Sequence, residues 1–196
     1  MVGAELEARG ATVVYTVRSQ ALVTGLVEGK PEPPMLKPSD ATLCFNGDLV
    51  RMREDRDPAD LYRRSAIAVW EWNAEPVGQR LSGRGLYFLA LHCDELGNSS
   101  GRGARVYYDK RGGAPSRLAG VLQRRLTAAK LTNSDHGMVI PRHYGVLNPQ
   151  YNPVPESVLL EMLTMSNPQD RRSVMDPHWR WKMARLIADS IGECEQ

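Results

Sequence analysis

Two polar residues at the ends of apolar segments, His92 and Glu161, are the strongest candidates for chemistry in this chain. His92 follows the apolar run 86–91, and Glu161 follows the compact run 157–160. Such runs, without polar alternation, are typical of strands that are buried on both faces. If the two strands are parallel neighbours, both side chains emerge at the same rim of the sheet, where α/β proteins collect ligands and chemistry.

An imidazole near a carboxylate is typical of the active site of a zinc hydrolase. The metal lowers the pKa of a bound water to roughly 7, and the carboxylate moves the protons. The residues alone leave other interpretations open: His92 also fits a hydrogen-bonded structural histidine, and Glu161 an acid at a helix N-terminus. His143 is a weaker candidate for the same rim, and Cys93 fits a buried apolar residue better than a catalytic thiol.

Composition bounds the protein class. At 196 residues and 42% hydrophobic content, the chain is long enough for one domain with a sizeable core. The net charge of +2 comes from scattered basic residues with almost as many acids, which disfavours a nucleic-acid surface. Three widely spaced cysteines indicate neither a disulfide framework nor a zinc knot, and no apolar run is long enough for a transmembrane segment.

The elements that must position these residues alternate between strands and helices. The patterns predict a helix over 1–9 that ends at Gly10, a strand over 12–16, and a loop-rich insertion at about 19–57 with a hairpin at Asn46-Gly47. They further predict helices over 60–72, from Ser116 and from Asp176-Pro177, and short strands over 104–108 and 144–147. This alternation favours a single α/β domain with a mostly parallel, twisted sheet and helices on both faces.

Two segments of the chain are Phe88-Leu-Ala-Leu-His-Cys-Asp94 and Val158-Leu-Leu-Glu-Met-Leu-Thr-Met-Ser-Asn167. They resemble the F-x-S-I-H-A-N strand end and the V-L-V-E-x-G-F-x-S-N segment of the zinc-dependent N-acetylmuramoyl-L-alanine amidases of the amidase-3 type. Three more segments follow the family's patterns in the same order, namely 6–16, 61–68 and 103–108. Five segments in register cover nearly the whole chain apart from the insertion.

The resemblance implies a single zinc ion held by His, Glu and His. His92 matches the second histidine ligand, and Glu161 matches the catalytic acid/base. The family's other two ligands lie in a D-x-G-H-G-G turn after the first strand and near the start of the first helix, so we expect them upstream of Met1. In this interpretation residues 1–196 are an N-terminally incomplete catalytic domain that lacks the first strand and the start of the first helix, which leaves open whether these residues are active by themselves.

The implied function is that of a peptidoglycan hydrolase, which cleaves the amide between N-acetylmuramic acid and L-alanine with zinc-activated water. The implied location is the periplasm or the extracellular cell envelope, with peptidoglycan and an activator or cell-division protein as partners. One alternative is a catalytically inactive homologue that binds peptidoglycan or a division partner without cutting. Another is an unrelated zinc or metal-free hydrolase on the same fold.

Overall fold

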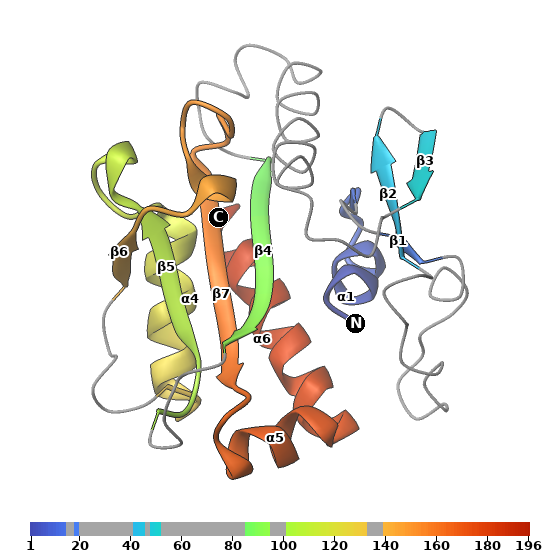
Figure 1. The fold of residues 1–196 in the computed structure, drawn as a ribbon, viewed down its shortest axis with the longest axis vertical. Coiled ribbons are helices and arrows are strands. Elements are labelled where there is room, and N and C mark those ends of the chain that lie inside the picture. The colour runs from blue at the N-terminus through green and yellow to red at the C-terminus, as the bar shows by residue number, and fades with distance from the viewer. Residues whose placement is uncertain (15–17, 20–40, 46–47, 52–84, 95–100, 133–138) are drawn as a thin grey trace.

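The computed structural model describes residues 1–14, 18–19, 41–45, 48–51, 85–94, 101–132 and 139–196. A four-stranded sheet of order β4-β7-β5-β6 forms the centre of this part of the chain (Figure 1). Its strands are β4 (Tyr87–Asp94), β5 (Arg105–Asp109), β6 (Ile140–Arg142) and β7 (Glu156–Thr164). A second, three-stranded antiparallel sheet contains β1 (Arg18–Ser19), β2 (Ala41–Phe45) and β3 (Asp48–Arg51).

The central sheet is mixed, which corrects the prediction of a mostly parallel sheet. Strand β4 is parallel to β7 and β5 is parallel to β6, but β5 runs antiparallel to β7. The connection 95–104 explains this direction, because ten residues are too few for the crossover that a parallel return requires. Strand β5 therefore starts at the end of the sheet where β4 stops.

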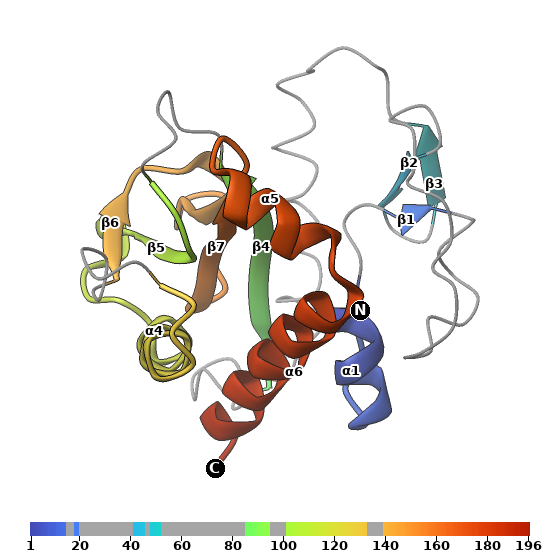
Figure 2. The same ribbon diagram turned by 90° about the horizontal axis from the view of Figure 1, so that it is seen from below.

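The described helices are α1 (Val2–Ala8), α4 (Arg117–Ala128), α5 (Pro168–Met175) and α6 (Pro177–Cys194), with short 3-10 turns η3 (Lys110–Gly112) and η5 (Gly145–Leu147). Helices α4 and α6 lie side by side against one face of the sheet (Figure 2). None of the described helices is both long enough and apolar enough to cross a membrane.

The two faces of the sheet carry different clusters, because successive strand residues point to opposite sides. Val106, Val158 and Leu160 point toward α4 and α6 and form the larger apolar core with them. Tyr107 and Leu159 point to the other face, where a smaller cluster includes Val146 and Leu147 of η5. Among the described elements, regular helices therefore cover one face only, whereas we predicted helices on both.

Helix α4 forms where the sequence predicts it. Its apolar residues recur at helical spacing, and the side-chain oxygen of Ser116 accepts from the backbone N–H of Ala119 at 3.3 Å. Glu156 adds a second cap from β7, because its Oε2 accepts from the backbone N–H of Leu118 at 2.7 Å. Strand β7 is thus tied directly to the helix that covers it.

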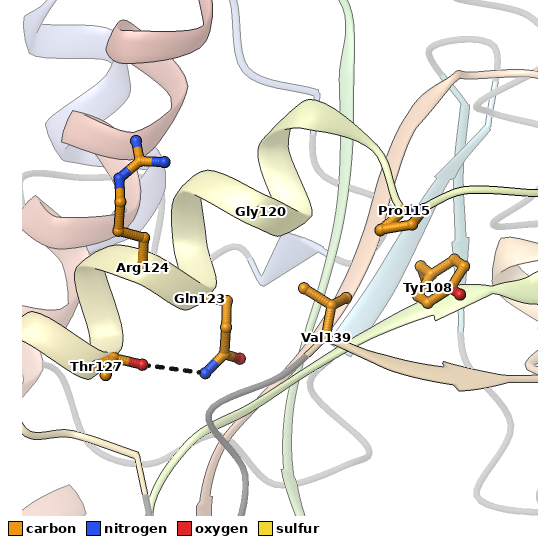
Figure 3. A pocket seen from close by; sticks show the side chains of 7 residues that line it. All are labelled: Tyr108, Pro115, Gly120, Gln123, Arg124, Thr127 and Val139. Atoms are coloured by element: carbon orange, nitrogen blue, oxygen red, sulfur yellow. Dashed lines mark hydrogen bonds between the residues drawn. The ribbon is translucent and has the colours of Figure 1, made fainter.

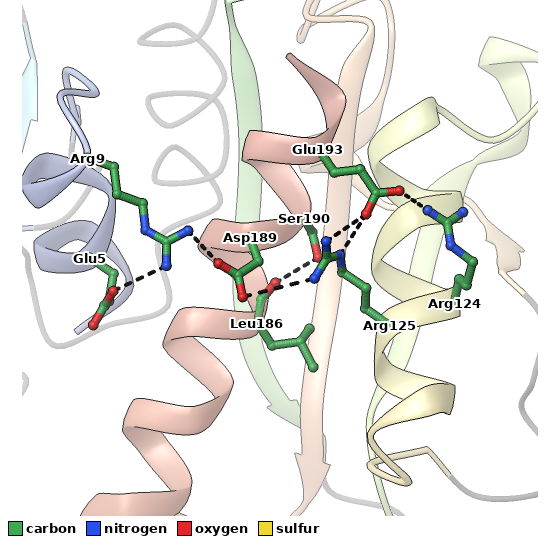
Figure 4. Close-up of polar contacts among 8 residues, drawn as sticks. All are labelled: Glu5, Arg9, Arg124, Arg125, Leu186, Asp189, Ser190 and Glu193. Atoms are coloured by element: carbon green, nitrogen blue, oxygen red, sulfur yellow. Dashed lines mark hydrogen bonds and ion pairs between the residues drawn. The ribbon is translucent and has the colours of Figure 1, made fainter. Parts of the chain in front are cut away.

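Ion pairs join α6 to the helices on either side of it (Figure 4). On one side, Arg9 of α1 donates to Asp189 at 2.6 Å. On the other, Glu193 accepts from Arg125 of α4 at 2.8 Å and also pairs with Arg124. These groups are half-exposed, so solvent screens the pairs and they add little stability, and the apolar contacts hold the helices together.

Most of the remaining predicted elements are present. Helix α1 ends as expected, with Gly10 at a φ of +88°, a conformation that glycine adopts without strain. Strands β2 and β3 pair across Asn46-Gly47 as the predicted hairpin. In contrast, the predicted strand 144–147 is the 3-10 turn η5, and residues 12–14 are not in a strand. The predicted helix over 60–72 lies outside the described residues.

Candidate active site

The structure brings His92 and Glu161 together. They are direct partners on the parallel strands β4 and β7, so both side chains project from the same face of the sheet. The Nδ1 atom of His92 lies 3.9 Å from Oε1 of Glu161. The imidazole is 42% exposed, whereas the carboxyl is only 10% exposed. The buried carboxyl of Glu161 therefore lies next to the imidazole of His92, which solvent and ligands can reach.

The strand that carries His92 is less buried than we predicted. Residues of β4 are half-buried or exposed, because β4 lies at the edge of the described sheet. Strand β7 lies in the middle and holds most of the buried positions. The long apolar run thus belongs to an edge strand, and the shorter run before Glu161 to the central one.

Arg105 is a third member of the site, and our sequence reasoning missed it. It pairs with Glu161 from the other side, on the antiparallel strand β5, and is only 3% exposed. Its Nη1 donates to the Oγ1 of Thr164 at 3.1 Å and lies 3.4 Å from Oδ2 of Asp94. The signal in the sequence was a charged residue between Ala104 and Val106, within the predicted strand 104–108.

Burial raises the pKa of Glu161 to about 7, with a further increase from the nearby Asp94 carboxylate and an opposing decrease from Arg105. Its Oε2 atom is buried and has no hydrogen-bond partner among the described residues. A carboxyl with a pKa near neutrality can both take up and release a proton at physiological pH. This combination is a recognised mark of functional sites.

A β-bulge lies directly beside the site. The register between β4 and β7 shifts after the pair His92 and Glu161, so that Asp94 pairs with Thr164. The backbone N–H of Met165 then donates to the carbonyl of Asp94 at 2.6 Å. Cys93 lies at the bulge as an exposed free thiol. Bulges bend a strand and redirect its side chains, and they are common next to active sites.

His143 does not join this site. Its Nδ1 lies 3.7 Å from Oδ1 of Asp109, at the opposite end of β5 from Arg105. Asp109 also accepts from the backbone and side chain of Arg111. Hydrogen bonds from Arg111 lower the pKa of Asp109, which therefore stays ionised.

The described residues do not complete a metal site by themselves. No group of three His, Cys, Asp or Glu side chains that could hold a metal ion occurs within the described ranges. The half-exposed His92 imidazole fits one ligand of a zinc ion, and the buried Glu161 fits a proton carrier beside it. The two further ligands that the family resemblance implies remain a prediction.

A separate depression of about 570 Å³ lies on the helix-covered side of β5 (Figure 3). Figure 3 shows Gln123 of α4 donating to Thr127 at its margin. The remaining lining residues are Tyr108, Pro115, Gly120, Arg124 and Val139. None of these side chains is an acid, a histidine or a cysteine, so the depression is not part of the site at Glu161.

The fold and the site define an α/β protein with a histidine and an acid on neighbouring strands of a mixed sheet. A family description, Amidase_3 or N-acetylmuramoyl-L-alanine amidase, matches residues 39–193. The chain therefore belongs to this family of amidases. The match includes both His92 and Glu161, whereas the segment 6–16, which also resembles the family, precedes it.

Solved structures agree on the fold. The catalytic domain of the amidase CwlV from Bacillus (Paenibacillus) polymyxa var. colistinus has 22% identity and a TM-score of 0.52, over 75% of this chain and 68% of that one. The CwlD amidase from Clostridioides difficile, solved with the GerS lipoprotein, has 21% identity and a TM-score of 0.55, over 75% and 71%. The apo amidase Ami1 from Mycobacterium abscessus has 26% identity and a TM-score of 0.53, over 67% and 60%. No curated protein matches the chain.

Proposed function

We propose that this protein hydrolyses peptidoglycan at the amide between N-acetylmuramic acid and L-alanine. The observation that carries the proposal is the pair of His92 and Glu161 on neighbouring strands, within a chain that belongs to the amidase family. Glu161 combines burial, an unpartnered oxygen and a pKa near 7, which are the properties of a carboxyl that moves protons.

Glu161 acts in this proposal as the general acid/base. Its ionised form takes a proton from the attacking water, and its protonated form then gives a proton to the departing amine of L-alanine. A pKa of about 7 keeps both forms populated at neutral pH, which favours proton transfer in both directions.

His92 is proposed as one ligand of a zinc ion. Bound zinc would supply a water of lowered pKa and would polarise the scissile carbonyl. The half-exposed imidazole is open to such an ion, while the neighbouring Glu161 lies close enough to reach a reactant held there. Removing the imidazole should therefore lower the zinc affinity of the protein as well as its activity.

The proposed substrate places the protein in the periplasm or at the extracellular cell envelope. A protein activator also belongs to the proposal, because the solved CwlD amidase was captured in a complex with the GerS lipoprotein. The competing proposal is an inactive homologue that binds peptidoglycan without cleaving it.

Hydrolysis of purified peptidoglycan tests the proposal through the release of new L-alanine amino groups. We expect Glu161→Gln to lower kcat by about 10²–10⁴ fold, the range of a general acid/base. Glu7→Gln is the matched control, because Glu7 is an exposed acid on α1. It should leave the rate unchanged.

The same samples separate the alternatives. Wild-type protein that is expressed from its full open reading frame, sediments with peptidoglycan and releases no amino groups, even with added zinc, would support the inactive homologue. Activity that survives a strong chelator would reject the zinc assignment of His92. Zinc content measured on His92→Ala gives a readout that does not depend on turnover.

A further inference from the structure

A group of basic side chains lies at the opposite end of β5 from the candidate active site. It consists of Lys110 and Arg111 after β5, Arg142 at the end of β6 and His143, and we call it the basic cluster. All four side chains are exposed. The buried carboxylate of Asp109 contacts two of them, Arg111 and His143.

Arg142 of the basic cluster and the active site share one face of the sheet. Arg105 pairs with Glu161, and Asp109, four residues further along β5, pairs with Arg142. Residues an even number apart on a strand point to the same face. Four residues of β5 at about 3.3 Å per residue, combined with the two strand spacings of about 4.8 Å between β7 and β6, place Arg142 roughly 16 Å from Glu161.

Aromatic rings lie between the two sites on this face. Tyr107 occupies the middle of β5, and its ring meets the ring of Tyr144 edge to face at 5.4 Å between centroids. Arg111 of the basic cluster donates to the backbone carbonyl of Tyr144 at 3.5 Å. The half-buried Tyr144 thus connects the basic cluster to the surface beside Glu161.

The cluster holds more positive charge than its own acid neutralises. Asp109 is already engaged by Arg111, whose Nε donates to it at 2.8 Å, and by His143 at 3.7 Å. Lys110 and Arg142 form no ion pair within the described part of the chain. Two exposed cations therefore remain for an anionic ligand.

We propose that the basic cluster binds carboxylates of the stem peptide of peptidoglycan, while the scissile amide lies at Glu161. This inference rests on the proposed function. An extended peptide spans about 3.3–3.6 Å per residue, so a separation of about 16 Å corresponds to four or five residues beyond the amide. The recognised substrate is thus a muramoyl peptide of four or five residues with free carboxylates at that distance.

Binding measurements test the inference independently of turnover. Two muramoyl tetrapeptides are compared by calorimetry, one with free carboxylates and one with the carboxylates beyond the second residue amidated. The protein is the full chain with Glu161→Gln, so that substrate is not consumed. Onto it we place Lys110→Gln with Arg142→Gln, or a control pair that removes the same charge from exposed positions on α5 and α6, Arg171→Gln with Lys182→Gln.

We expect the basic-cluster pair to raise the Kd of the free-carboxylate peptide about fivefold, the size of two exposed charge contacts. The amidated peptide should bind the unmodified cluster equally weakly, and the control pair should bind both peptides normally. Equal affinity for the two peptides, or equal losses in the two variant pairs, would overturn the inference, as would the absence of any peptide binding.

Two further outcomes distinguish a failure of this inference from a failure of the proposed function. The first outcome is that the wild-type protein cleaves no muramoyl peptide but still binds the free carboxylates through the basic cluster. This result would reject the proposed hydrolysis and support the proposed binding site. The second outcome is that a glycerol-phosphate polymer displaces the peptide and binds more tightly than the peptide does. This result would assign the basic cluster to phosphates and would overturn the stem-peptide assignment.

Discussion

Replacing Glu161 by glutamine should change the pH dependence of folding stability in a specific direction. The folded state holds the Glu161 carboxyl at a pKa of about 7, raised from 4.5 mainly by burial. A raised carboxyl pKa means that the folded state binds the proton more tightly than the unfolded state. The contribution of Glu161 to the stability of the wild type is therefore fully present at acidic pH, below the unfolded pKa of 4.5, and is lost as the pH rises to the folded pKa of about 7.

The size of this loss follows from the shift. The rise from 4.5 to about 7 amounts to about 3 kcal/mol at 1.36 kcal/mol per pH unit. Since the carboxyl is only 10% exposed, solvent screening reduces this figure little. Most of the loss should fall between about pH 5 and pH 7, where the unfolded chain is ionised and the folded site is not.

Urea unfolding at a series of pH values measures this effect, with tryptophan fluorescence and circular dichroism as probes. The quantity of interest is the free energy of unfolding of Glu161→Gln minus that of the wild type, because all other titrating groups cancel. This difference should rise by about 3 kcal/mol from pH 4.5 to pH 8. Glu7→Gln, at an exposed position on α1, serves as the matched control.

A constant difference across that range would refute the reasoning, since it would mean that Glu161 titrates alike in the folded and unfolded chain. A difference that decreases as the pH rises would contradict even the direction of the pKa shift. It would place the folded pKa below the unfolded value, so Arg105 would outweigh burial and the Asp94 carboxylate.

Two buried groups beside the site yield further predictions. Arg105→Met should lower the free energy of unfolding, measured with urea, by about 3 kcal/mol or more, because Asp94 and Thr164 lose their charged partner. Arg105→Lys should recover part of this loss. Equal stability of the wild type and the two variants would contradict this prediction. Asp170→Ala should cost about 2–4 kcal/mol, since its Oδ2 accepts from the backbone N–H of Thr164 at 2.9 Å and of Gly103 at 2.7 Å, whereas Asp170→Asn should cost less.

The sequence predicted the helical side of the fold well. The spacing of Leu118, Leu122 and Leu126 predicts the apolar face of α4, and all three are fully buried. The caps Ser116 and Asp176 also mark the starts of α4 and α6 correctly. These signals are local, because a helix satisfies its hydrogen bonds within its own segment.

Strand direction and burial could not be predicted in the same way. Hydrophobic runs show that 86–91 and 157–160 form strands, but not which strand is central and which lies at an edge. The antiparallel direction of β5 depends on pairing with β7, about fifty residues later in the chain. The short helix α5 was missed as well, since only Val174 and Met175 of its eight residues are apolar, apart from Pro168.

The site could be predicted only as far as it depends on single strands. His92 and Glu161 each end an apolar run, and their roles as ligand and acid/base remain predictions. Arg105 joins them only because β5 returns antiparallel and places it opposite Glu161. A buried arginine is expected to be costly without partners, so its position indicates an arrangement that no single segment reveals.

The β-bulge explains how those partners become available to Arg105. From His92 to Asp94 is two residues on β4, but from Glu161 to the partner of Asp94 is three residues on β7. Strict alternation would have turned Thr164 toward the helix-covered face, away from Glu161. The extra residue reverses this alternation, so that the Thr164 hydroxyl meets the Arg105 guanidinium at 3.1 Å. The bulge therefore supplies a hydrogen-bond partner for the buried cation, and that cation in turn lies directly across from the carboxyl proposed to move the proton.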